Sequence, residues 1–146
     1  MKRLRRWFAV GLLTASLLSV PGGITAGDKY QELINCDPHV GPCTQTLSEI
    51  TVTLEVAPKP IKAMQDLSFT VTLTGKLPSV QKAPYIDLSM PGMQMGPNRV
   101  QLRSVGEHAY EGRGVIIKCP SGRKIWQATV TIPEAGQTDF IFNVIY

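Results

Sequence analysis

The stretch Ile50-Thr51-Val52-Thr53-Leu54-Glu55-Val56 decides the fold class of this chain. Its apolar and polar residues alternate, so that every second side chain points to the same face of an extended segment. This period of two predicts a β-strand with one buried face. The stretch Leu67-Ser68-Phe69-Thr70-Val71-Thr72-Leu73 repeats the pattern after breaks at Pro58 and Pro60. Two such strands in succession indicate an all-β domain.

Further strands are predicted between glycine and proline breaks, which brings the number to about seven. They cover residues 85–90, 99–104, 108–118, 124–132 and 138–145. No segment after residue 48 has the 3.6-residue period of a helix. We therefore predict an immunoglobulin-like antiparallel sandwich. The likeness is architectural, because the cysteine and tryptophan signature of antibody domains is absent.

The first 26 residues have the composition of a secretory signal peptide. Four basic residues precede an apolar run over residues 7–20, and small residues follow near position 26. The run is shorter than the roughly 20 residues of a membrane-spanning helix. We therefore expect a cleaved signal over residues 1–26, a periplasmic or secreted location, and no membrane span in the mature chain.

The remaining 120 of the 146 residues suffice for one domain. We predict an N-terminal arm over residues 27–47, which contains two cysteines but shows no periodicity, and a sandwich domain over residues 48–146. Four of the fifteen lysines and arginines lie in the signal, whereas none of the eleven acidic residues does. The mature chain then has eleven charges of each sign, so its composition does not favour a nucleic-acid partner.

Three of the five methionines lie within six residues, in Met90-Pro91-Gly92-Met93-Gln94-Met95. Met93 and Met95 point to the same side of an extended segment, and the Pro91-Gly92 turn can fold Met90 back beside them. Thioethers are soft ligands that suit Cu(I). The alternative is that these methionines fill gaps in a core or form an adaptable contact surface.

His108 follows the turn that starts the next strand pair. If that turn lies at the same end of the sandwich as the methionines, Met90, Met93, Met95 and His108 make a mixed thioether and imidazole site suited to copper. Otherwise, His108 is a solvent-facing turn residue. Enzyme chemistry finds little support, because the chain contains only two histidines and lacks a nucleophile elbow, a phosphate-binding loop and a zinc-protease helix.

The three cysteines, Cys36, Cys43 and Cys119, all lie in the exported part, where disulfides are expected. Their odd number leaves one thiol over. A local Cys36–Cys43 loop and a long-range bridge to Cys119 are both open at this point. A reduced pair flanking His39 is a third arrangement, suited to a soft or borderline cation.

Three motifs occur in order along residues 85–132: Met-Pro-x-Met-x-Met at 90–95, Gly106 with Tyr110, and Gly122 with Trp126. On these motifs the chain resembles the YtkA-like family and the related FixH-like proteins, small exported or membrane-tethered sandwiches. The resemblance implies copper handling and a role in oxidase or efflux assembly. The chain departs from the family in having no histidine directly after Met95, and its cysteine arm has no counterpart.

These observations lead to two expectations for function. The first is an exported, non-enzymatic copper-binding or copper-handling protein, with Cu(I) as the favoured cofactor and a copper-delivery or envelope-assembly protein as partner. The second is an envelope protein-protein interaction module in which the Met-Pro turn is an apolar contact surface.

Overall fold

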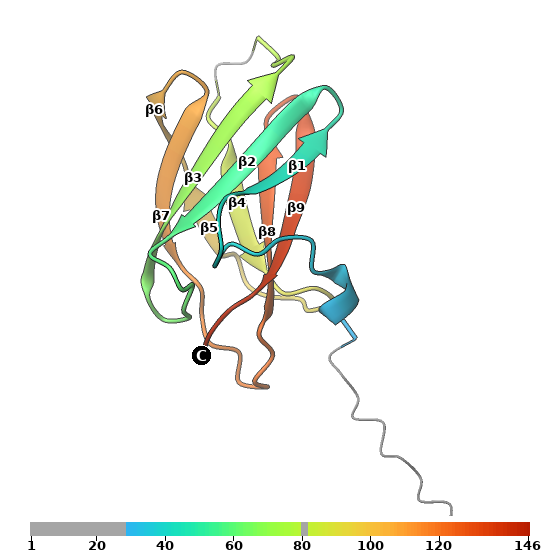
Figure 1. Cartoon of the computed structure of the whole chain (residues 1–146), viewed down its shortest axis with the longest axis vertical. Coiled ribbons are helices and arrows are strands. Elements are labelled where there is room, and N and C mark those ends of the chain that lie inside the picture. Colours follow the sequence, from blue (N-terminus) through green and yellow to red (C-terminus); the bar gives the residue numbers. More distant parts are fainter. Residues whose placement is uncertain (1–28, 80–81) are drawn as a thin grey trace, which may run out of the picture.

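The chain folds as a sandwich of two antiparallel β-sheets (Figure 1). A computed structural model describes residues 29–79 and 82–146. One sheet has the strand order β1-β2-β3-β7-β6 and the other β5-β4-β8-β9. One turn of 3-10 helix, η1 (Gln31–Leu33), precedes the first strand. The strands are β1 (Cys43–Leu47), β2 (Ile50–Ala57), β3 (Asp66–Gly75), β4 (Tyr85–Ser89), β5 (Arg99–Gln101), β6 (Arg103–Gly106), β7 (Ala109–Val115), β8 (Ile125–Ile132) and β9 (Gly136–Asn143).

The core lies between the sheets and is built from the alternating side chains. Val52, Leu54 and Val56 of β2 are fully buried, whereas the residues between them are half-buried or exposed. From the other sheet, β8 contributes Trp126 and Val130 to the same core. Burying a large apolar side chain stabilises the fold by about 1.5–3 kcal/mol. The predicted all-β antiparallel sandwich is confirmed.

The described residues form nine strands, where the sequence predicts about seven. One of the additional strands, β1, lies within residues 27–47, so the prediction of an irregular arm is wrong for residues 43–47. β1 pairs with β2 from Cys43 opposite Leu54 to Leu47 opposite Ile50. It has no apolar alternation because it is an edge strand whose middle residues, Thr44 to Thr46, are half-buried or exposed.

The other additional strand arises because the segment predicted over residues 99–104 belongs to both sheets. β5 pairs with β4, with Gln101 opposite Tyr85, whereas β6 pairs with β7. Leu102 lies at the crossing and is buried. Val100 is buried as well, so the period of two continues through the crossing and does not reveal the change of sheet.

The connections gather at the two ends of the sandwich. One end carries η1, the loop after β4, the β7–β8 loop and the C-terminus, and we call it the methionine end (Figure 1). The other end carries the β6–β7 turn and the described residues between β3 and β4 (76–79 and 82–84), and we call it the histidine end. The predicted signal peptide over residues 1–26 lies outside the described residues. Among those described, no helix has the length and apolar character needed to cross a membrane.

Candidate functional site

The predicted methionine cluster lies in the loop between β4 and β5, which we call the methionine loop (residues 90–98). Met90 is only 2% exposed and belongs to the core. Met93 and Met95 are half-buried and pack against the core, whereas Gln94 between them is exposed. The predicted shared side for Met93 and Met95 therefore agrees with their burial. An open cluster of three methionines is not formed, because Met90 is taken into the interior.

His108 lies at the histidine end, away from the methionines. It follows β6 with a positive φ of 57° and is exposed. There it lines a cavity with Leu77 and Ile132, whereas the methionine loop leaves β4 at the Ser89 end, opposite Gln127 of β8. The expected grouping of His108 with the methionines is therefore wrong. A single pass of extended chain through β5 and β6 separates the two turns, and one pass connects opposite ends of a sandwich.

The next pass, β7, returns the chain to the methionine end and leads into the β7–β8 loop, which we call the cysteine loop (residues 116–124). The two loops are bonded to each other at both ends. Arg123 donates from Nη2 to the carbonyl oxygen of Pro91 at 2.8 Å. Asn98 donates from Nδ2 to the carbonyl oxygen of Val115 at 3.2 Å, at the end of β7. The loops thus run side by side in opposite directions, with Cys119 midway along one and residues 93–95 midway along the other.

A turn at Gly92 holds the start of the methionine loop. Met93 donates its N–H to the carbonyl oxygen of Met90 at 3.1 Å, and Gly92 has a φ of +68°, which an L side chain rarely adopts. A Cβ at this position would also collide with the Tyr30 hydroxyl. The Arg123 guanidinium stacks on the Tyr30 ring at 4.3 Å from its centroid. Tyr30 therefore binds the segment before η1 to both loops.

Cys119 is the free cysteine of the chain, and it is buried. Its Sγ lies 3.0 Å from the Ser121 hydroxyl. This hydrogen bond lowers the pKa of the Cys119 thiol below its ordinary value, against the opposing effect of desolvation by burial. Cys119 belongs to the core cluster against which Met93 and Met95 pack. The methionine end therefore carries a thiol of raised acidity on the cysteine loop and two half-buried thioethers on the methionine loop.

The C-terminal residue, Tyr146, holds the cysteine loop from within. Its hydroxyl accepts hydrogen bonds from the backbone N–H of Cys119 at 3.2 Å and from Trp126 Nε1 at 3.1 Å. The same hydroxyl donates to the carbonyl oxygen of Arg123. These three hydrogen bonds on one hydroxyl fix the loop at Cys119 and at Arg123.

The other two cysteines form a disulfide, Cys36–Cys43, so the local pairing that the sequence left open is the one present. His39 within this loop has both ring nitrogens engaged. Nδ1 accepts from the backbone N–H of Ile61 at 3.0 Å, and Nε2 lies 2.9 Å from the carbonyl oxygen of Asn143, to which it donates. The thiol and imidazole site that the reduced pair would form is therefore not present. His39 instead connects the disulfide loop to the β2–β3 connection and to the end of β9.

Residues 29–79 and 82–146 contain no group of three or more His, Cys, Asp and Glu side chains placed to hold a metal ion. A site formed by Met93, Met95 and Cys119 would depend on thioethers, which bind soft cations and do not belong to such a group. Sequence reasoning considered Cys119 as a disulfide partner or as a leftover thiol, and did not place it beside the methionine loop. The signal that could have found it is the parity of strands, because the cysteine loop follows the methionine loop by two passes.

No protein-family model, no curated protein and no solved structure matches this chain. The resemblance to the YtkA-like and FixH-like proteins therefore remains a prediction.

Proposed function

We propose that this protein is an exported, non-enzymatic copper-binding protein that holds Cu(I) between the methionine loop and the cysteine loop. Its ligands would be the thioethers of Met93 and Met95 and the thiolate of Cys119. The observation that carries the proposal is the pair of hydrogen bonds, Arg123 to Pro91 and Asn98 to Val115, that sets these loops side by side. With the loops held in this way, the middle of the methionine loop, which contains Met93 and Met95, is expected to face the middle of the cysteine loop, which contains Cys119.

Charge favours a thiolate over a third thioether in this place. A Cu(I) ion held by methionines alone leaves one uncompensated positive charge in a partly buried site, and such burial is costly. With the thiolate of Cys119 the charges cancel. The hydrogen bond from Ser121 supports the thiolate form that metal binding requires.

The half-buried state of Met93 and Met95 suits an ion that has to be passed on. Apolar surroundings keep water from the metal, while the loop remains at the surface, where exposed Gln94 and Gly96 flank Met95. We propose a periplasmic or secreted location and a copper-delivery or envelope-assembly protein as partner. In this proposal Met90 packs in the core and does not bind the ion. His108 is not a copper ligand either.

The test is a Cu(I) titration of the chain lacking residues 1–26, under anaerobic conditions, against a chromogenic chelator that competes for the ion. We expect the Met93→Leu/Met95→Leu variant and the Cys119→Ser variant each to lose affinity for Cu(I). The loss should be at least the roughly 10–100-fold that removal of an outer-shell partner costs a metal site. Leucine keeps the volume and apolar character of methionine, so the fold should be retained.

Two matched methionine variants serve as controls. Met64→Leu changes a methionine that is 69% exposed on the β2–β3 connection, and Met90→Leu changes the buried one. Both should bind Cu(I) as the parent does. Equal affinity of the double leucine variant and the parent overturns the proposal, as does a parent that binds no Cu(I). A loss confined to Met90→Leu would move the site into the core and reject the ligand set proposed here.

A contact module is the second candidate, and one surface feature favours it. Met64, Ile117 and Ile145 are large, apolar and between 44% and 69% exposed. They belong to adjacent segments, because the N–H of Met64 donates to Ile116 and that of Ala63 donates to Ile145. Such a patch is typical of a protein-protein contact. If the parent binds no Cu(I) in the titration, this function takes precedence.

A further inference from the structure

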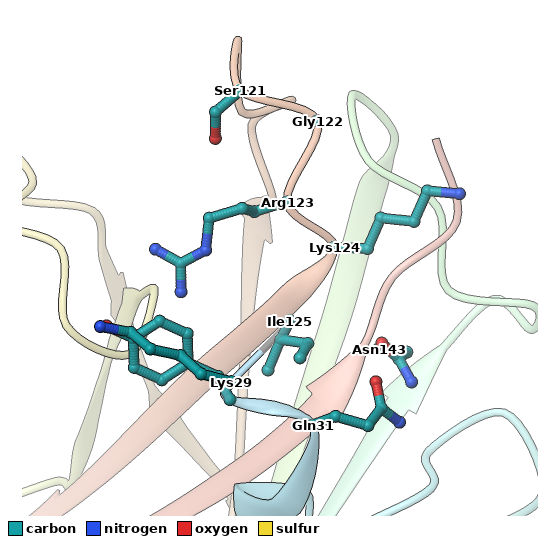
Figure 2. Close-up of a pocket in the computed structure, with 9 residues that line it drawn as sticks. Lys29, Gln31, Ser121, Gly122, Arg123, Lys124, Ile125 and Asn143 are labelled. Carbon is teal, nitrogen blue, oxygen red and sulfur yellow. The ribbon is translucent and has the colours of Figure 1, made fainter. Parts of the chain in front are cut away.

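Two surfaces of the methionine end adjoin the cysteine loop. One is an open cavity of about 690 Å³ between the start of η1 and residues 121–125, shown in Figure 2. The other consists of Met64, Ile117 and Ile145, which we call the apolar patch. None of these three residues lines the cavity, so the two surfaces are separate.

Met64 is the centre of the apolar patch. Its N–H donates to the carbonyl oxygen of Ile116 at 2.7 Å, and the N–H of Ala63 donates to that of Ile145 at 2.9 Å. The side chain of Met64 is 69% exposed, and its φ of +60° is unfavourable for a bulky L residue. A single copy of the chain therefore holds an apolar side chain outward at a cost in free energy. Burial against another molecule would offset that cost.

The charges on the two sides of Met64 have opposite signs. Lys62, Met64 and Asp66 are exposed, whereas Ala63 and Gln65 between them are half-buried. The three exposed side chains therefore follow one another along the surface as a cation, an apolar group and an anion.

Both charged residues belong to segments of fixed backbone. Lys62 forms a β-bridge with Ile145, and Asp66 is the first residue of β3. Neither side chain forms an ion pair with another residue in the described part of the chain. Lys118, at the edge of the apolar patch, lies over the Tyr146 ring at 5.9 Å from its centroid. The charges of Lys62 and Asp66 can therefore pair with those of a second molecule.

We propose that the apolar patch binds the same patch of a second copy of this chain, in a two-fold symmetric dimer. With the axis at Met64, the two Met64 side chains contact each other, and Lys62 of each copy faces Asp66 of the other. The pattern is self-complementary, because a two-fold axis reverses its direction and brings each cation opposite an anion. This gives the contact surface of the second candidate function a partner. The dimer does not depend on copper, because none of the three proposed sulfur ligands belongs to the apolar patch.

The experiment measures the mass of the chain lacking residues 1–26 by sedimentation equilibrium, from about 10 μM to about 1 mM, at low and at high salt. Three side chains make a small interface, so the dimer should form in the upper part of this range and weaken as salt is added. Non-reducing gels show whether any dimer is covalent.

The variant that tests the axis is Met64→Lys, which places two like charges opposite each other. It should weaken the dimer at least about tenfold. The control is Val105→Lys, which adds the same charge at a valine of β6 that is 60% exposed at the histidine end. It should stay within about threefold of the parent. If Met64→Lys does not fold, Met64→Gly takes its place, because glycine suits a positive φ and has no side chain to bury.

Charge reversal tests the pairing of Lys62 with Asp66. Lys62→Asp and Asp66→Lys each place like charges opposite each other and should weaken the dimer at least about tenfold. The double variant restores opposite signs and should return to within about threefold of the parent. The control Lys82→Asp changes the net charge as Lys62→Asp does, at an exposed lysine of the histidine end, and should dimerise as the parent does.

Each outcome decides the proposal. A parent that remains monomeric over the whole range overturns it, as does a dimer that the Met64 variant leaves unchanged. A double charge reversal that dimerises no better than the single ones also overturns it. An equal loss in Lys82→Asp and Lys62→Asp does so as well, because net charge alone would then explain the effect. Unfolding curves show whether each variant is folded.

Discussion

The two ends of the sandwich differ in how their loops are held. At the methionine end, side chains bond loops that are far apart in sequence: His39 to Ile61, Arg123 to Pro91, and Asn98 to Val115. At the histidine end, Lys76 pairs with Glu49 and His108 lies 3.8 Å from a Glu107 oxygen, and all four side chains are exposed. Exposed pairs of this kind contribute about 0–1 kcal/mol. The methionine end is therefore the more strongly cross-bonded of the two.

This difference bears on function because binding sites require fixed geometry. Two loops that present ligands to one metal ion must keep their separation, or the free energy of ordering them is lost from the binding free energy. The methionine end meets this requirement through hydrogen bonds at both ends of each loop. It also contains the free thiol and two half-buried thioethers. If the cross-bonds stabilise the methionine end, side-chain removal there should destabilise the fold more than a matched removal at the histidine end.

The largest effect is expected for Arg123→Ala. The change removes the hydrogen bond to Pro91 and the stacking on Tyr30, and we expect it to lower the free energy of unfolding by about 2–3 kcal/mol. The matched control is Arg103→Ala in β6, an exposed residue for which we expect a change within about 0.5 kcal/mol. Urea unfolding with the disulfide intact measures both. Equal midpoints for the two variants would show that the two ends do not differ.

A smaller effect is expected for His39→Ala. The backbone N–H of buried Ile61 then loses its acceptor, which should cost about 1–2 kcal/mol. At the histidine end, His108→Gly removes a side chain from a residue with a positive φ, so the free energy of unfolding should stay within about 1 kcal/mol of the parent or rise. Thermal or urea unfolding compares the two variants. If His108→Gly destabilises the fold more than His39→Ala does, the comparison of the ends is wrong.

Much of the fold is predictable because buried strands carry a strong local signal. β2, β3 and β8 alternate between buried apolar and less buried residues over their length, and this pattern depends only on the period of an extended chain. β1 has no such signal, because an edge strand buries little on either face. The switch of the chain from β5 to β6 is also hidden, since Leu102 stays inward while its neighbours change partners.

The site is predictable only in part. The shared side of Met93 and Met95 follows from their spacing, whereas the burial of Met90 depends on packing between sheets. The separation of His108 from the methionines follows from the parity of strands, once each pass is assigned correctly. The pairing of the cysteine loop with the methionine loop is not predictable from strand order alone. It depends on hydrogen bonds from Arg123 and Asn98 to carbonyl oxygens of residues distant in sequence. Every residue has a backbone carbonyl, so the sequence does not indicate which of them accepts such a bond.

The smallest expected effect concerns the acidity of Cys119. Ser121→Ala removes the hydrogen bond that lowers the pKa of this thiol most, so the pKa should rise toward its ordinary value, while the backbone N–H groups of residues 121 and 123 and the Arg123 charge continue to lower it. A folded-state pKa below that of the unfolded chain stabilises the fold above the unfolded thiol's pKa, and this contribution is lost as the pH falls through the folded pKa. The variant should therefore lose stability at alkaline pH and change little at neutral pH.

The carbon NMR shift of the Cys119 Cβ, followed against pH in the folded protein, measures the pKa directly, because Cys119 is the free cysteine. The control is Ser104→Ala at the histidine end. The Ser104 hydroxyl donates to the nearby carbonyl oxygen of Gly106, so its removal should leave the titration of Cys119 unchanged. A lower thiolate fraction in Ser121→Ala should also weaken Cu(I) binding at neutral pH, by less than the Cys119→Ser change does. If Ser121→Ala and Ser104→Ala give the same Cys119 titration curve, the Ser121 hydroxyl does not lower the pKa of Cys119. The affinity for Cu(I) would then depend on the sulfur ligands and on the hydrogen bonds between the two loops, without a contribution from Ser121.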